Sequence, residues 1–110
     1  MHTKLAFRSA VETGKLIKQG KLSSEKVTRT LLERIDKFDR SLGSYASLLA
    51  QAAVRQARQA DREVRAGKIR SPIHGVPLAV KDLCDIRGLP TTGGIPAFED
   101  RIAETDSTVV

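Results

Sequence analysis

The sequence SPIHGVPLAVKDLCDIRGLPTTGG, residues 71–94, combines a short apolar run, a charged pair and two turns that contain glycine. Residues 75–80 begin with glycine and are otherwise apolar, and a short apolar run between glycine and charge is typical of a buried strand. Side chains on a strand alternate between its faces, so Lys81 would lie on the same face as Pro77 and Ala79. Burial beside such small residues would remove water from a lysine, disfavour its ammonium form and make it a candidate general base. A solvated lysine at the exit of a strand is the alternative interpretation.

The same stretch resembles the lysine-bearing motif of the amidase signature family. The usual form of that motif is a Gly-Pro-Leu-His-Gly-Ile-Pro strand, then Val-Lys-Asp, a variable link, Gly-Leu-Pro-Thr-Thr and a glycine. The matching segments here are residues 71–77, 80–82 and 88–94. Two positions depart from the pattern, because Ser71 stands where glycine is common and Ile95 stands where the family often has a serine.

The resemblance extends over nearly the whole chain. Residues 22–36 resemble the family's N-terminal helix, residues 50–67 its alanine-rich second helix, and residues 106–110 the opening of the helix after the lysine loop. The resemblance therefore implies an α/β fold, in which residues 1–110 supply N-terminal helices and the first core strand of the amidase-signature mixed sheet. It also implies that residues 1–110 are the N-terminal part of a single amidase-signature domain.

The chemistry that the resemblance implies is attack on the carbon–nitrogen bond of a small carboxamide, without a cofactor. In such enzymes a serine attacks the amide carbonyl, a second serine in a cis peptide relays its proton, and a lysine accepts that proton. Lys81 matches this lysine. The resemblance places Thr91, Thr92, Gly93 and Gly94 near the active site, which makes them candidates for substrate binding, although the same residues can form a simple turn.

None of the serines in the chain lies in a glycine-rich nucleophile turn. In the family both catalytic serines lie well downstream of the lysine, so we expect an N-terminal portion of an amidase that is inactive alone and is completed by the remainder of the domain. Asp106 or Ser107 would begin a helix at the end of the chain. Uncovered apolar faces of an incomplete domain would favour association, so a homodimer is open as well.

Three other functions are open on the sequence. The transamidase branch of the family, represented by the A-type subunit of glutamyl-tRNA(Gln) amidotransferase, delivers ammonia from glutamine to a charged transfer RNA. It usually has cysteine and alanine after the threonines, whereas this chain has two glycines, which favours a general bacterial amidase. A basic helical module that binds RNA would suit the net charge of +6. A protein that associates with other chains and has lost catalysis would suit the missing serines.

Helical periodicity predicts three helices before residue 71. Ser9 and Glu12 have the spacing of a capping box at the start of the first helix, and Gly20 ends it. The second helix begins at Ser23 or Ser24, and residues 39–44 form the loop beyond it. Its core stripe comprises Val27, Leu31, Ile35 and Phe38.

The alanine-rich third helix runs to about Ala66 and stops at Gly67, and residues 45–49 before it form either a short strand or a lead into it. Its alanine stripe faces the core, and the opposite face is a solvated arginine surface rather than one for nucleic acid. The alanine stripe includes Ala53, Ala57, Ala60 and Val64, and the arginines are Arg55, Arg58, Arg62 and Arg65.

Composition excludes several classes of protein. No apolar run approaches the roughly 20 residues that cross a bilayer, and the N-terminus has no secretory apolar core, so we expect a cytoplasmic protein without a membrane partner. The single cysteine, Cys84, excludes an internal disulfide and is interpreted as a small core residue. His2 and His74 form no metal-ligand cluster of known spacing, and His74 is interpreted as a structural turn residue.

Overall fold

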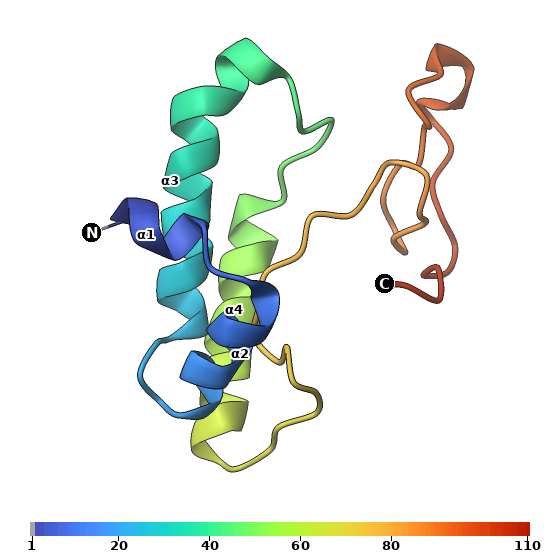
Figure 1. Ribbon diagram of the computed structural model, residues 1–110. Coiled ribbons are helices and arrows are strands. Elements are labelled where there is room, and N and C mark those ends of the chain that lie inside the picture. The colour runs from blue at the N-terminus through green and yellow to red at the C-terminus, as the bar shows by residue number, and fades with distance from the viewer. Residues whose placement is uncertain (1) are drawn as a thin grey trace. The chain divides into compact units, whose positions relative to one another are not determined.

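The structure, a computed structural model, describes residues 2–110, with side chains from residue 4 onward. Two compact units divide the chain, Met1–Pro77 and Leu78–Val110. Figure 1 shows helices in the first unit and mostly turns and loops in the second. The elements are α1 (His2–Ala6), α2 (Ala10–Lys18), α3 (Ser24–Leu42), α4 (Ala50–Arg65) and the short 3₁₀-helix η1 (Pro96–Phe98).

Both ends of α2 follow from local side-chain and backbone chemistry. The capping box is confirmed, because Ser9 Oγ accepts a hydrogen bond from the Glu12 amide at 3.2 Å while Glu12 Oε2 accepts one from the Ser9 amide at 3.1 Å. Gly20 adopts a φ of +68° after the helix. The Gly20 amide donates a hydrogen bond to the Ile17 carbonyl at 2.9 Å. A helix that ends in a residue at positive φ favours glycine there, because glycine reaches positive φ without strain.

The start of α3 is bonded to α4. Ser23 is the N-cap residue, and its side chain accepts a hydrogen bond from the Lys26 amide at 3.1 Å. The Asp61 carboxylate of α4 accepts two more, from the amides of Ser24 at 2.7 Å and Glu25 at 3.0 Å. The first amides of a helix lack partners within the helix, so a distant aspartate here both caps α3 and joins it to α4.

Replacing Asp61 with alanine is therefore expected to destabilise the first unit by about 0.5–2 kcal/mol, the usual cost of losing a cap. Chemical denaturation followed by circular dichroism measures this loss. Asp36→Ala, at an exposed position of the same helix that Asp61 caps, is the matched control. Equal stability of the two variants would contradict the capping role.

The helices pack through small residues and a few apolar side chains. Figure 1 shows α3 and α4 side by side; α1 packs on α3, and α2 packs on α4. The α4 stripe is confirmed at its centre, where Ala57 and Ala60 are buried. Gly14 of α2 lies against the backbone of Pro72, since a β-carbon built on Gly14 would come within 2.1 Å of the Pro72 carbonyl oxygen. Because Gly14 has no side chain, α2 and the backbone at Pro72 can approach each other this closely.

A second close approach joins α3 to the turn at Gly75, in the first segment of the lysine-bearing motif. Ser24 is 1% exposed, and its hydroxyl donates to the Gly75 carbonyl at 2.5 Å. Gly75 has a φ of +81°, and a β-carbon on it would lie 3.2 Å from Ser24 Cβ and 3.4 Å from Ala60 Cβ. The glycine, the serine and the alanine thus fill one tightly packed corner.

The predicted course of α3 is correct at its start and wrong at its end. The helix continues to Leu42 through the residues expected to form a loop, and it ends at Gly43, which has a φ of +60°. Val27 is buried as expected, but Phe38 is 41% exposed, with the Arg34 guanidinium 5.0 Å from the centre of its ring. The stripe is therefore core only near the first turns of the helix.

The predicted first core strand is wrong. Within residues 2–110 the structure has no strand and no sheet, and its β-structure is one isolated antiparallel bridge between Pro90 and Ile102. The backbone amides of residues 78–80 donate no hydrogen bond to any described group, and Leu78 is 66% exposed. A strand requires hydrogen-bonded pairing with a second segment, and the described chain supplies none to this run, so its apolar pattern alone does not produce a strand. Residues 45–49 form no strand either, and they lead into α4, which is the second of the two alternatives for this segment.

The second unit consists of two loops joined by backbone hydrogen bonds. The Thr91 amide donates to the Arg101 carbonyl at 3.1 Å, and the Ala103 amide donates to the Leu89 carbonyl at 3.0 Å. Ala103 and Thr91 are the buried residues of this unit, at 4% and 8% exposed. The unit has a correspondingly small apolar interior, and polar contacts carry much of its organisation.

The helix expected to begin at Asp106 or Ser107 is not formed in the described chain. The two side chains instead accept hydrogen bonds from an earlier turn, Ser107 Oγ from the Asp85 amide and Asp106 Oδ1 from the Arg87 amide, each at 2.7 Å. Side chains that cap helices can equally accept hydrogen bonds from the amides of a nearby turn, and Asp106 and Ser107 do so here.

Candidate functional site

Lys81 lies at the start of the second unit, where its carbonyl accepts a hydrogen bond from the Cys84 amide at 2.9 Å. Its side chain is exposed, as are those of Ala79 and Val80 beside it. The water-depleted surroundings expected from a buried strand are therefore not formed by the part of the chain that the structure describes. Cys84, expected in the core, is only half-buried.

Asp82, the residue after Lys81, binds the threonine–glycine loop. Its carboxylate accepts one hydrogen bond from the Thr92 amide at 2.9 Å and a second from the Thr92 hydroxyl. Its backbone carbonyl accepts a third, from the Gly93 amide at 2.8 Å. The Thr92 hydroxyl in turn accepts from the Gly94 amide at 3.1 Å. We call these four bonds the Asp82 clamp.

The clamp holds the Asp82 carboxyl in its ionised form. The hydrogen bonds from the Thr92 side chain and amide lower the pKa of Asp82 the most, and burial opposes them with a smaller effect. The Gly94 amide and the Lys81 charge lower this pKa further, each by less than burial raises it. Hydrogen bonds to the charged form of a carboxyl stabilise that form, so the clamp and the negative charge support each other.

This coupling predicts how the clamp responds to acid. The folded pKa of Asp82 lies below the ordinary value of about 3.9, so the clamp contributes to stability above that pH and loses its contribution as the pH falls through the folded value. The amide proton shift of Thr92, followed by NMR against pH, should titrate with a midpoint below about 3.9. The titration should vanish in Asp82→Asn, and a midpoint at or above the ordinary value would contradict the clamp.

A second pair of charged residues stabilises the other side of this unit. The guanidinium of Arg101 donates from its two terminal nitrogens, Nη1 and Nη2, to the two oxygens of the Asp85 carboxylate, at 2.7 and 3.1 Å. Arg101 lowers the pKa of Asp85, a hydrogen bond from Thr91 lowers it further, and Asp85 raises the pKa of Arg101 in return. Two parallel bonds between guanidinium and carboxylate fix orientation as well as distance.

The structure therefore divides the predicted loop into two parts. Thr92, Gly93 and Gly94 are joined to the residue after Lys81, whereas Thr91 is buried beside Asp85. Sequence reasoning missed Asp85 and its partner, because they are 16 positions apart and Asp85 lies in the variable link of the motif. An aspartate followed at a distance by an arginine carries no local signal.

His74 belongs to a separate cluster in the first unit. It is 8% exposed, and its Nδ1 accepts a hydrogen bond from the Arg70 amide at 3.4 Å. Its Nε2 lies 3.2 Å from Glu63 Oε2, which also binds the Arg70 guanidinium at 2.8 Å. The burial and these contacts agree with a structural role in the turn rather than with a base open to substrate.

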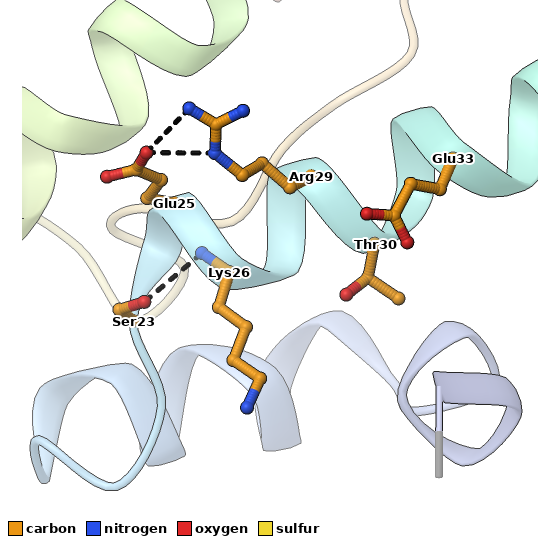
Figure 2. Close-up of a pocket in the computed structure, with 6 residues that line it drawn as sticks. All are labelled: Ser23, Glu25, Lys26, Arg29, Thr30 and Glu33. Atoms are coloured by element: carbon orange, nitrogen blue, oxygen red, sulfur yellow. Dashed lines mark hydrogen bonds and ion pairs between the residues drawn. The ribbon is translucent and has the colours of Figure 1, made fainter.

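One pocket of about 320 Å³ runs along the first turns of α3. Figure 2 shows Glu25 turned toward Arg29 while the Lys26 side chain extends in another direction. The pocket contains none of the residues that we assign to the reaction, and its charged groups are partly paired with one another. It is lined by Ser23, Glu25, Lys26, Arg29, Thr30 and Glu33.

Two classes of site can be addressed for the described residues. No group of three or more histidine, cysteine, aspartate or glutamate side chains among them is placed to hold a metal ion. None of the helices within residues 2–110 combines the length and the apolarity that crossing a membrane requires.

Comparison with known proteins gives matches over most of the chain. The profile of the family described as Amidase matches residues 26–110. A Mycobacterium tuberculosis protein named "Putative amidase AmiD" is 39% identical over 99 residues, which cover 90% of this chain and 21% of that protein. The A-type subunit of the glutamyl-tRNA(Gln) amidotransferase of Acidothermus cellulolyticus is 40% identical over 106 residues, 96% of this chain and 21% of that protein.

A third relative, an acylamidase of Rhodococcus erythropolis, is 31% identical over 106 residues, 96% of this chain and 22% of that protein. The chain thus spans about a fifth of the length of the curated relatives that it matches.

Proposed function

This chain belongs to the amidase family, and on that premise we propose that residues 1–110 are the N-terminal part of a single amidase domain that hydrolyses the carbon–nitrogen bond of small, non-peptide amides. The proposal assigns Lys81 as the general base. It assigns Thr91, Thr92, Gly93 and Gly94 to the wall of the substrate site. The two serines that complete the reaction are expected outside this chain, so residues 1–110 alone are expected to be inactive.

The proposed reaction runs through proton transfer from serine to lysine. The nucleophilic serine attacks the amide carbonyl and forms a carbon–oxygen bond, while its proton passes through the second serine to the neutral amine of Lys81. The proton then returns to the leaving nitrogen as the carbon–nitrogen bond breaks, and water hydrolyses the resulting ester. Lys81 therefore has to be unprotonated when it acts, which requires that other parts of the enzyme cover its side chain.

The Asp82 clamp is the observation that carries the proposal. It brings the lysine turn and the threonine–glycine loop, which are separated by ten positions in the sequence, into direct contact within one unit. The two halves of the motif thus form one local structure with an exposed lysine beside it. Such an arrangement suits a lysine that serves a substrate from outside the unit rather than one that stabilises its interior.

The loop conformation favours a plain amidase over the transamidase branch. Gly93 and Gly94 have φ values of +58° and +74°, and residues with a β-carbon enter this region only with strain. The cysteine and alanine usual in the transamidase pattern would not follow this backbone path freely. A transamidase component remains the second candidate, since an amidotransferase protein is among the relatives.

The basic face of α4 gives less support to an RNA-binding module. Arg58 is committed to Glu25, at 3.0 Å, and the Glu25 carboxylate raises the pKa of Arg58. Arg62 contacts the side-chain oxygen of Gln59 at 2.5 Å. Two of the four arginines of this face are thus engaged within the protein and are less available for phosphate contacts.

The test uses the natural protein isolated from its source cells, with its intact mass measured first. A set of simple aliphatic and aromatic amides is then assayed by ammonia release, beside residues 1–110 produced alone. We expect turnover by a longer natural protein and none by residues 1–110. A natural protein without amidase activity, or turnover by the 110-residue chain, would contradict the proposal.

A further inference from the structure

Asp82 does not take part in the proton transfers of the proposed reaction, yet its carboxylate and its backbone carbonyl both bind the threonine–glycine loop. Three hydrogen bonds from the loop converge on it, and the fourth bond of the clamp connects Thr92 to Gly94. Both oxygens of its carboxylate are used. A residue that only ended a turn would not need both oxygens and its own carbonyl for the same loop.

We propose that Asp82 is a positioning residue for the reaction, and that with Thr92 it sets where the backbone of Gly93 and Gly94 lies relative to Lys81. This inference rests on the proposed function and extends it. Consecutive α-carbons are about 3.8 Å apart. Because Asp82 follows Lys81 directly in the chain, the threonine–glycine loop that is bonded to Asp82 has little freedom to move relative to the Lys81 backbone. The two glycines, which have no side chains, expose their backbone to a substrate that approaches the lysine.

The chemistry of the clamp restricts which side chains can form it. The Thr92 hydroxyl donates to Asp82 and accepts from the Gly94 amide at the same time, which a hydroxyl can do and a methyl group cannot. Serine at position 92 keeps this double role, whereas valine keeps the shape and loses it. Asparagine at position 82 keeps the size of the side chain but offers one acceptor oxygen instead of two.

Loss of the clamp should therefore reduce catalysis without unfolding the protein. A misplacement of about 1 Å in a catalytic arrangement lowers rates by up to roughly 10²-fold. In the natural full-length protein we expect Asp82→Asn and Thr92→Val to lower kcat/KM by about 10-fold to 10²-fold. Thr92→Ser should stay within about threefold of the parent, since it rebuilds the same bonds. Asp100→Asn, the same change at an exposed aspartate of the same unit, is the matched control and should leave kcat/KM unchanged.

A second measurement reports the clamp without reference to activity. Hydrogen exchange at the amides of Gly93 and Gly94 is expected to accelerate in Asp82→Asn and in Thr92→Val, while Thr92→Ser and Asp100→Asn keep the parental rates. All assays are run well below the melting temperature of each variant, so that a loss through unfolding does not enter the comparison.

The outcomes separate this inference from the proposed function. Parental kcat/KM in both Asp82→Asn and Thr92→Val overturns the positioning role, and so does a Thr92→Ser variant that loses as much as Thr92→Val. Unchanged exchange at both glycines overturns the clamp itself. If the parent hydrolyses no amide, or Lys81→Ala retains full activity, the proposed function fails and the positioning role fails with it, while the exchange data still decide whether the clamp orders the loop.

Discussion

Lys81→Ala is expected to lower kcat for amide hydrolysis by about 10²–10⁴-fold in the natural protein, the usual contribution of a positioned general base. Alanine leaves no group to accept the proton that comes from the serines. The side chain is exposed in the described unit, so its removal should cost little stability. Steady-state kinetics on a simple amide, beside thermal unfolding of the same samples, measures both effects.

Lys81→Arg provides the sharper comparison. Arginine keeps the positive charge and most of the length, but its guanidinium cannot lose a proton under working conditions. We expect it to be as inactive as alanine if Lys81 acts as a base. Recovery of activity by arginine would instead indicate that the site needs a cation. Lys21→Ala, at an exposed lysine of the first unit, is the control for the removal of a positive charge.

Gly14→Ala is expected to destabilise the first unit by about 1–3 kcal/mol, the usual cost of overpacking. Helix propensity predicts the opposite sign, since alanine is favoured over glycine inside a helix by about 0.8–1.0 kcal/mol. Here the new methyl group would lie 2.1 Å from the Pro72 carbonyl oxygen, a backbone atom that cannot rotate away. Denaturant unfolding followed by circular dichroism gives the sign.

The control for this substitution is Lys15→Ala, one position along α2 at an exposed site. It adds alanine to the same helix without placing a methyl group against Pro72, so it should be close to neutral. If both variants unfold at the same denaturant concentration as the parent, the contact between α2 and the Pro72 backbone is not as close as the structure indicates.

Helices α2, α3 and α4 were predictable because their signals are local, whereas α1 was not among the predicted helices. The capping box at Ser9, the N-cap at Ser23 and the glycines after α2 and α4 each act within a few residues, and periodicity identified the buried alanines of α4. The contacts between helices were not predictable from such signals. The carboxylate of Asp61 that caps α3 comes from 37 positions away in the sequence.

The prediction of a strand was wrong for a related physical reason. The apolar alternation of residues 76–80 indicates what a strand would look like once paired, but pairing depends on a second segment that periodicity does not reveal. The predicted end of α3 was wrong for a different reason. Residues 39–44 contain serine and glycine, which are typical of loops, yet the helix continues to Leu42 and the Asp39 carboxylate accepts from the Ser44 amide at 2.7 Å beyond its end.

The motif predicts which residues form the candidate site, and this prediction stays a proposal; the arrangement of those residues could not be predicted from the sequence. The motif singled out Lys81 and the threonine–glycine loop as candidates, but it did not reveal the hydrogen bonds between Asp82 and Thr92. The exposure of Lys81 and the pairing of Asp85 with Arg101 depend on how distant segments meet. Neither follows from the residue types at those positions.

Ser24, Ala60 and Gly75 form one packed corner, so the substitutions that evolution can accept at these three positions depend on one another. A β-carbon at position 75 would meet the side chains of both other residues, at a φ that favours glycine. A larger residue at 24 or 60 would likewise press on the Gly75 backbone, and the loss of the Ser24 hydroxyl would leave a buried carbonyl without its donor. We therefore expect descendants of this chain to retain small residues at all three positions or to replace them jointly. Whether a substitution at one position is tolerated would then depend on which residues already occupy the other two.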